Sequence, residues 1–231
     1  MADTVTVLQP MSTYQPEEFD FVYRNADAVL QRSSEFADLV KKRRTIRNFA
    51  NTPVDKQVIF NACAAANSAP SGANMQPWHF VAISDRTIKQ SIRTAAENEE
   101  RELYEHRASE EWLAALAPLG TDANKPFLET APWLIAVFAR KHTIDENGNK
   151  KKHYYTPESV GIATGILITA LHYSGLATLT HTPSPMGFLR DILGRPNHEK
   201  PFVLITTGYP VKPVEVPAIR KLGVKDVTTF L

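Results

Sequence analysis

Residues 68–84, SAPSGANMQPWHFVAIS, place two prolines and a glycine directly before an apolar run. The run that begins at Trp78 predicts a buried strand. The residues around Gly72, between Pro70 and Pro77, are typical of a turn. Successive backbone N–H groups around a glycine can form a nest for the electron-rich edge of a flat ligand. A plain connection between a helix and a strand is the alternative.

Helical and strand patterns alternate along the rest of the chain, which predicts an α+β domain with a mixed or antiparallel central sheet flanked by helices. Helices are expected from Ser33 or Ser34 into the basic run 41–47, over 55–69, over 87–116 with an interruption allowed, over 158–175 and around 186–194. Strands are expected over 78–84, 131–139, 177–182 and 201–209, with a loop over 145–153.

The composition limits the classes of protein that this chain can represent. Of its 231 residues, 43% are hydrophobic and 22% charged, which is typical of a globular domain. The formal charge of +1 gives no reason to expect nucleic acid as a partner. The only cysteine, Cys63, excludes an internal disulfide and a multi-cysteine metal site, and we expect no metal. No secretory signal is evident at the N-terminus, so a cytoplasmic protein is expected.

The apolar segment Val160–Thr180 is long enough to cross a membrane. It contains His172, several hydroxyl groups and Gly175, and polar residues lie close to both of its ends. We therefore expect a helix buried in a core or in a subunit interface, with no membrane as partner.

A basic run, KKRRTIR, occupies Lys41–Arg47. On a helix, Arg43, Arg44 and Arg47 would lie on one face and could converge on a single anion, to which planar guanidinium groups are well suited. A solvated helix terminus is the alternative interpretation.

Several motifs in this order resemble the flavin-dependent nitroreductase superfamily, and within it the iodotyrosine deiodinase group of reductive halotyrosine dehalogenases. They are RRTIRNF, APSGANMQPWHF, THTP and TTGYP, with KKKHYY and LGRPNHEK specific to the smaller group. The resemblance extends from about Phe36 to the C-terminus. It implies a homodimer with FMN at the subunit interface, each site being built from both chains, and a C-terminal tail exchanged between subunits.

The resemblance also assigns residues to this cofactor. The FMN-binding residues would be Arg43, Arg44, Thr45, Arg47, Pro70, Ser71, Gly72, Thr180 and Thr182. Relatives add an arginine from the tail, where this chain offers Arg220 or Lys221, and the choice between them stays open. The catalytic groups would be the Thr182 hydroxyl, directed at flavin N5, and the Ala73 N–H, directed at the substrate phenolate. The role of His181 stays open, with a packed structural histidine as the favoured interpretation.

An acidic stretch, ENEERELYEHRASEEW, contains seven glutamates in sixteen residues, most of which are typical of a solvated helix face. Glu100 and Tyr104 are four residues apart and so share one side of a helix. The resemblance places these two with Lys125 in a mobile lid that closes on the zwitterion of an amino acid. Small nitroaromatic substrates need no such set of groups.

The implied activity is FMN-dependent reductive dehalogenation of halotyrosines or related halophenols by one-electron steps. The alternatives are a broad NAD(P)H-dependent nitroreductase or quinone reductase, a flavin-destroying enzyme of cobalamin synthesis, and a flavin-binding protein without activity. The electron donor, NAD(P)H or a reductase, is not identified by any nucleotide-binding motif. We expect an N-terminal arm over 1–35 and a flavin domain over 36–231, with a lid at about 95–127 and a C-terminal extension at about 211–231.

Overall fold

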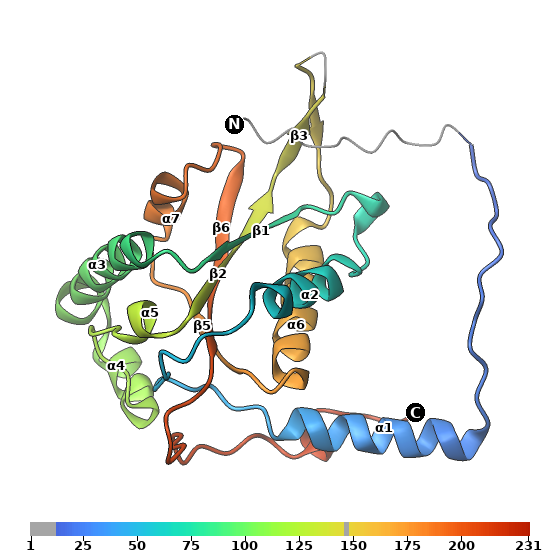
Figure 1. Ribbon diagram of the computed structural model, residues 1–231, viewed down its shortest axis with the longest axis horizontal. Helices are drawn as coiled ribbons and strands as arrows, with labels where there is room; N and C mark the ends of the chain where they lie inside the picture. Colours follow the sequence, from blue (N-terminus) through green and yellow to red (C-terminus); the bar gives the residue numbers. More distant parts are fainter. Residues whose placement is uncertain (1–12, 146–147) are drawn as a thin grey trace.

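A four-stranded antiparallel sheet forms the centre of the computed structural model, which describes residues 13–145 and 148–231 (Figure 1). Its spatial order is β1 (Trp78–Ile83), β2 (Trp133–Arg140), β6 (Glu199–Gly208) and β5 (Ala177–His181). The two central strands are apolar on both faces because helices cover both sides of the sheet. The predicted antiparallel sheet flanked by helices is confirmed, and each predicted strand is present.

Two hydrophobic clusters lie on opposite faces of the sheet. On one face α2 (Lys56–Asn67) and α6 (Thr156–Tyr173) pack over the sheet. On the other face lie α3 (Arg86–Glu102), α5 (Phe127–Thr130) and α7 (Gly187–Ile192). Figure 1 shows the two sets of helices on either side of the strands.

Helix α2 begins where the sequence indicates, because the Asp55 side chain accepts a hydrogen bond of 2.6 Å from the backbone N–H of Gln57. Cys63, in the same helix, is half-buried against the core. Burial raises the pKa of its thiol to about 11, so the thiol stays protonated near neutral pH.

Helix α6 buries one side, including Ala163, Leu167 and Leu171, and leaves Ile162 exposed. It is the expected apolar helix. In the described part of the chain, no helix is both long and apolar enough to cross a membrane.

The long helical stretch is interrupted, as the sequence allowed. After α3 comes a π turn, Leu103–Arg107, which closes with a 2.8 Å hydrogen bond from the Ala108 N–H to the Leu103 carbonyl. Helix α4 (Glu110–Leu116) then starts at Ser109, whose hydroxyl accepts from the Trp112 N–H, and a 3-10 turn, Ala117–Leu119, follows.

The prediction for the first helix was wrong at both ends. Helix α1 covers Ala26–Lys41 and so begins inside the expected arm, because the Asn25 side chain caps it by accepting a 2.8 Å hydrogen bond from the Ala28 N–H. The helix ends before the arginines, which lie in an extended segment. Thr45 in this segment forms a parallel bridge with Thr178 at the edge of β5.

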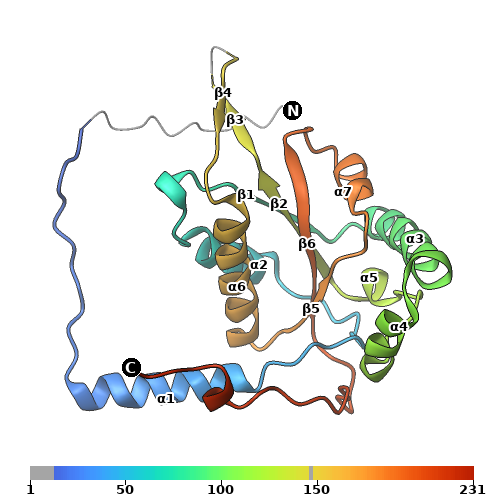
Figure 2. The same ribbon diagram turned by 180° about the vertical axis from the view of Figure 1, so that it is seen from behind.

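The expected loop over 145–153 was also partly wrong, since it includes a strand. Strands β3 (His142–Ile144) and β4 (Lys150–Lys152) form a separate antiparallel hairpin. The C-terminal segment after β6 has one short 3-10 turn, Val224–Asp226, and otherwise no regular structure. Figure 2 shows it returning beside α1. Residues 1–12 of the expected arm and residues 146–147 of the loop lie outside the described residues.

Gly208 has no room for a side chain, because an added Cβ would lie 2.4 Å from Pro132 Cδ. We expect Gly208→Ala to lower the free energy of unfolding by about 1–3 kcal/mol, since the proline ring cannot move independently of the backbone. Urea unfolding measures this loss. Gly187→Ala is the control, since nothing lies within 4 Å of that added Cβ, and an unchanged midpoint for Gly208→Ala would contradict the prediction.

Candidate functional site

The turn before β1 has an unusual backbone. Ala73, Asn74 and Gln76 have φ values of 49°, 53° and 46°, in the left-handed region that residues with a Cβ rarely occupy. Such conformations persist only where the surroundings enforce them, and they occur preferentially at binding and catalytic sites. The turn is therefore more than a chain reversal.

Contacts with the start of α6 hold this turn in place. The Gly72 N–H donates to the Ser159 hydroxyl oxygen over 3.4 Å, and the Gln76 N–H donates to the Ser71 hydroxyl oxygen over 2.9 Å. A Cβ on Gly72 would lie 2.9 Å from the carbonyl oxygen of Tyr154, so only glycine fits. Trp78, 4% exposed, packs in the core behind the turn and donates to Asn67 over 2.8 Å.

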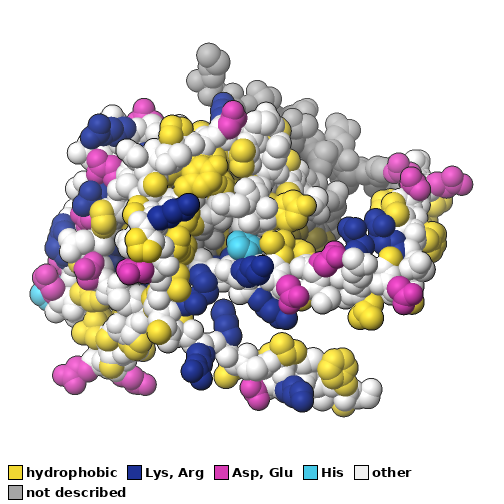
Figure 3. Space-filling view, turned by 60° about the horizontal axis from the view of Figure 1, so that its bottom comes forward, with side chains coloured by type: hydrophobic (Ala, Val, Ile, Leu, Met, Phe, Trp, Pro, Cys, Tyr) yellow, Lys and Arg dark blue, Asp and Glu magenta, His cyan; other side chains and the backbone are white. Residues whose placement is uncertain are grey.

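The three candidate arginines lie in the extended segment, so the proposed common helix face does not exist. Arg43 and Arg44 instead line a cavity of about 320 Å³ together with His172 and Thr178. Arg44 also donates to the carbonyl oxygen of Pro217 in the C-terminal segment. Figure 3 shows Lys and Arg side chains gathered around a histidine near the middle of this side of the molecule.

Arg47 lines a different cavity, of about 430 Å³, with Phe127 and Lys212. The segment itself is fixed to the edge of β5 by a 3.2 Å hydrogen bond from the Ile46 N–H to the Thr178 carbonyl. This places Arg43 and Arg44 beside the strand that carries the candidate threonines.

Thr180 and Thr182 alternate with His181 at the end of β5 and are exposed, whereas His181 is buried. Alternate residues of an extended chain point the same way, so both hydroxyls lie on one side. Neither has a hydrogen-bond partner among the described residues, which leaves both free to bind a ligand.

The three candidate substrate residues lie close together. The Lys125 ammonium lies 3.2 Å from a Glu100 carboxylate oxygen and 5.7 Å from the centre of the Tyr104 ring. The Tyr104 hydroxyl donates to the Thr121 carbonyl oxygen over 3.1 Å. Both charged side chains are almost fully buried, at 4% and 9% exposure. We call Glu100, Tyr104 and Lys125 the clamp.

His181 lies between the clamp and the free hydroxyls. Its ring contacts Phe127 edge-on, with 5.7 Å between ring centres. Among the described residues, its Nε2 is buried without a hydrogen-bond partner. Burial, and secondarily the positive charge of Lys125, lowers the pKa of His181 to about 3, so the imidazole is neutral near pH 7.

The candidate tail cations follow Pro217, whose carbonyl accepts from Arg44. Arg220 and Lys221 are both exposed, and no described contact joins either to Arg43 or Arg44. The segment before them is anchored by a 3.0 Å hydrogen bond from the Val211 N–H to the Asn48 carbonyl. The choice between the two cations therefore stays open.

The candidate residues form two separate groups within one chain. The turn around Gly72 packs on the start of α6, while the clamp lies on α3 and before α5. Figures 1 and 2 agree that the turn between α2 and β1 lies on the opposite side of the sheet from α3. No described contact joins the turn to Thr182 or to the clamp.

Sequence reasoning missed the residues that support both groups. Ser159 accepts a hydrogen bond from the turn, and the Tyr154 carbonyl leaves room only for glycine at position 72. Tyr154 belongs to the KKKHYY motif, but no local pattern shows that either residue contacts the turn. Glu97 accepts a hydrogen bond from the Lys125 N–H, although no sequence pattern separates it from the solvated glutamates.

The donors present fit FMN. Guanidinium groups suit its phosphate, the free hydroxyls of Thr180 and Thr182 suit the polar edge of its ring, and the glycine turn allows close approach of backbone to a flat surface. The guanidinium groups of Arg43 and Arg44 and the two threonine hydroxyls lie near β5, whereas the glycine turn precedes β1.

Several known proteins are similar to this chain. Residues 40–209 match the model of the nitroreductase family. The iodotyrosine deiodinase of Haliscomenobacter hydrossis is 48% identical over 208 residues, covering 90% of this chain and 89% of that protein. The human iodotyrosine deiodinase 1 is 44% identical over 194 residues, covering 84% of this chain and 67% of that protein.

A solved structure is also similar. It is an oxidised iodotyrosine deiodinase bound to FMN and 3-iodo-L-tyrosine, with a TM-score of 0.72 and 31% sequence identity. The match covers 84% of this chain and 100% of that one.

The neutral, buried His181 makes stability depend on pH. An unfolded histidine has a pKa of 6.5, whereas the folded value is about 3. Between pH 6.5 and about pH 3, His181 therefore binds a proton in the unfolded chain but not in the folded protein. We expect the free energy of unfolding to fall as the pH drops below about 6.5, by at most about 1.4 kcal/mol per pH unit from this group.

His181→Phe keeps the aromatic packing and removes this proton, so it should flatten the profile between pH 7 and pH 5. Urea unfolding of both proteins at each pH measures the difference in their free energies of unfolding. The other histidines are the same in both proteins, so their contributions cancel. His106→Phe, at an exposed position, is the control. Parallel profiles for the wild type and His181→Phe would show that His181 is not held neutral.

Proposed function

This chain belongs to the nitroreductase family, and we propose that it is an FMN-dependent reductive dehalogenase that converts halotyrosines to tyrosine and halide. The relatives of 44% and 48% identity are iodotyrosine deiodinases, and the similar structure holds FMN and 3-iodo-L-tyrosine. The clamp is the observation that carries the proposal, because it offers opposite buried charges to an amino-acid zwitterion.

The clamp discriminates by charge. Without substrate, Glu100 and Lys125 neutralise each other. A halotyrosine brings one ammonium for Glu100 and one carboxylate for Lys125, so every charge keeps an opposite partner. A ligand with only one charge would leave a buried charge unpaired, which is strongly unfavourable. Tyr104, the third residue of the clamp, adds a hydroxyl group that can form a hydrogen bond.

The reaction replaces a carbon–halogen bond with a carbon–hydrogen bond, consuming two electrons and one proton and releasing halide. FMN, when bound, supplies the electrons in one-electron steps. The chain holds and orients the partners. The Ala73 N–H would donate to the substrate phenolate oxygen, and the Thr182 hydroxyl would donate to the ring of the cofactor.

The proposed cofactor contacts come from the residues near β5 and from the turn around Gly72. Arg43, Arg44, Thr45 and Arg47, with Arg220 or Lys221, would bind the phosphate and ring edge, with Thr180 nearby. Pro70, Ser71 and Gly72 would line the ring. The lid, at about 95–127, would close over the substrate and exclude water.

A homodimer is part of the proposal. The turn precedes β1, whereas the basic segment joins β5 at the opposite edge of the sheet, and two related chains would bring a turn and a β5 edge together. An apolar cavity of about 560 Å³ between α2 and α6 offers a contact surface, with Phe36 and Ile162 in its lining. Exchange of the C-terminal tail, the donor NAD(P)H or a reductase, and the cytoplasmic location stay predictions.

Anaerobic turnover of 3-iodotyrosine tests the function. With dithionite as reductant, the FMN-loaded protein should form tyrosine. Lys125→Ala should lower kcat/KM by at least about a hundredfold, because the variant leaves the buried substrate carboxylate without an opposite charge. The exposed Lys56→Ala is the matched control.

The runner-up function predicts a different result. A broad nitroreductase would reduce nitroaromatics with NAD(P)H, form no tyrosine, and be indifferent to Lys125→Ala. That combination would overturn the proposed function.

Subunit mixing tests whether each site uses two chains. Gly72→Val damages only the turn, and Arg43→Ala damages only the β5 edge, so each homodimer should be inactive. Co-expression produces hybrid dimers in which one site carries both defects and the other none. We expect recovery of about a quarter of wild-type activity, as random assembly of a two-fold dimer requires. Recovery of none would place both groups in a site made by one chain.

A further inference from the structure

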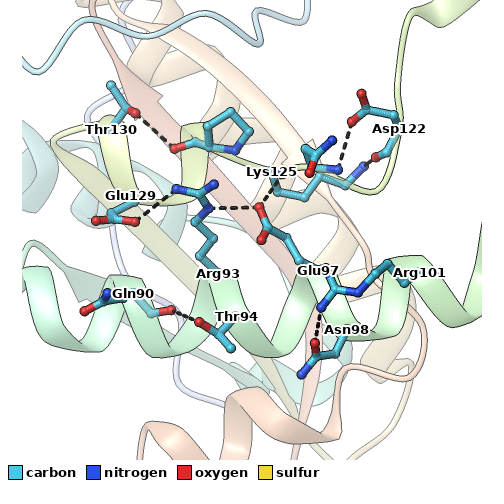
Figure 4. A network of polar contacts seen from close by, with 12 residues as sticks. Gln90, Arg93, Thr94, Glu97, Asn98, Arg101, Asp122, Lys125, Glu129 and Thr130 are labelled. Atoms are coloured by element: carbon cyan, nitrogen blue, oxygen red, sulfur yellow. Dashed lines mark hydrogen bonds and ion pairs between the residues drawn. The ribbon is translucent and has the colours of Figure 1, made fainter.

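A network of polar contacts joins α3 to the segment that carries Lys125 (Figure 4). One carboxylate oxygen of Glu97 accepts a hydrogen bond of 2.8 Å from the backbone N–H of Lys125. The same oxygen accepts 2.8 Å from Nε of Arg93. The backbone of Lys125 is thus held by Glu97. Its ammonium contacts Glu100, the Thr121 hydroxyl and the Asp122 carbonyl.

These two anchors lie on one side of α3. Arg93, Glu97 and Glu100 are spaced by four and three residues, so they follow a single helix face. Lys125 lies along this face, with its backbone at Glu97 and its ammonium about one turn farther on, at Glu100. Only the contact between the Lys125 ammonium and Glu100 must break when the ammonium pairs with a substrate carboxylate. The backbone hydrogen bond to Glu97 can stay.

Arg93 also holds the chain on the far side of Lys125. Its Nη1 lies 3.1 Å from a carboxylate oxygen of Glu129 in α5. Lys89, one turn earlier on α3, donates to the carbonyl oxygens of Glu129 and Ala131 over 3.0 Å and 2.7 Å. The residues after Lys125 are therefore fixed to the same helix.

We propose that Glu97 and Arg93 are positioning residues for substrate recognition, which fix the backbone of Lys125 so that only its ammonium moves from Glu100 to the substrate carboxylate. This inference rests on the proposed function and deepens it. Neither residue touches the substrate. They keep the Lys125 backbone in one position while its ammonium exchanges the Glu100 carboxylate for the substrate carboxylate. This fixed position preorganises the clamp.

The charges of the network suit this task. Burial opposes the ionisation of Glu97, but hydrogen bonds from Arg93 and from the Lys125 N–H outweigh it, so the pKa of Glu97 lies below its usual value. Glu97 therefore stays charged when Glu100 loses Lys125. The acceptor is half-buried, with 15% of its side chain exposed, so solvent screens it little.

Four variants of the FMN-loaded protein test the proposal: Glu97→Ala, Glu97→Gln, Arg93→Gln and Glu102→Ala. Glu97→Ala removes the acceptor, whereas Glu97→Gln keeps an oxygen for the Lys125 N–H. Arg93→Gln removes the guanidinium that orients Glu97. Glu102→Ala is the matched control, since this glutamate of α3 is exposed and has no partner among the described residues.

The first readout needs no turnover. Hydrogen–deuterium exchange, followed at the Lys125 amide without substrate, should speed up about tenfold or more in Glu97→Ala, because its hydrogen bond to a charged acceptor is lost. Glu97→Gln should retain most of the protection, Arg93→Gln should lose part of it, and Glu102→Ala should match the wild type.

The second readout separates positioning from general support. In Glu97→Ala, the KM for 3-iodotyrosine should rise about tenfold, while kcat/KM for 2-iodophenol, which has no zwitterion, should stay within about twofold. Glu97→Gln should restore most of the affinity for 3-iodotyrosine.

Two results would overturn the proposal. One is an unchanged amide exchange and KM in Glu97→Ala. The other is an equal loss on both substrates together with a lower melting temperature and FMN content, which would make Glu97 a support of the fold only. A wild type that forms no tyrosine overturns the proposed function instead, and the exchange measurement still decides whether Glu97 holds Lys125.

Discussion

Two opposite charges removed from water must pair with each other, and the Glu100–Lys125 contact of 3.2 Å meets that requirement in this protein. Breaking such a pair by removing one partner typically costs about 3–5 kcal/mol. The surrounding structure follows from this constraint. The π turn, the segment before α5 and the hydrophobic cluster on this face of the sheet all bury the pair. Only a ligand that replaces both partners can separate the two charges without leaving one alone.

The second feature that organises the molecule is the edge strand β5. Its residues alternate between two environments, with His181 facing Phe127 and the clamp, and Thr180 and Thr182 facing outward. The basic segment joins the same edge through the Thr45–Thr178 bridge. One short strand thus places the cations of the basic segment, free hydroxyls and a ring contact to Phe127 within a few residues of each other. The rigid centre, formed by β2 and β6, keeps these groups in register.

Local signals in the sequence predicted much of the fold, and tertiary contacts account for the rest. Asp55 before an apolar helix and the apolar run at Trp78 each identify an element by itself. Helix α1 buries no residue in the described chain, and its start at Asn25 rests on the side-chain cap to the Ala28 N–H rather than on core packing. The extended form of the arginine segment depends on pairing with β5, which no local pattern encodes. Glu97 and Glu100 look alike in the sequence, and only the fold separates a backbone anchor from a charge partner.

The π turn Leu103–Arg107 constrains how the segment after α3 can change in evolution. It adds one residue to a helical turn, and Tyr104 lies within it while Glu100 lies in the regular helix before it. Removing one residue would restore an α-helical ladder, but it would rotate everything downstream by about 100° around the helix axis. Substitutions within the turn leave the spacing intact, whereas insertions and deletions shift the register between the turn and Ser109. The length of this segment should therefore vary less than its composition among proteins that share the clamp.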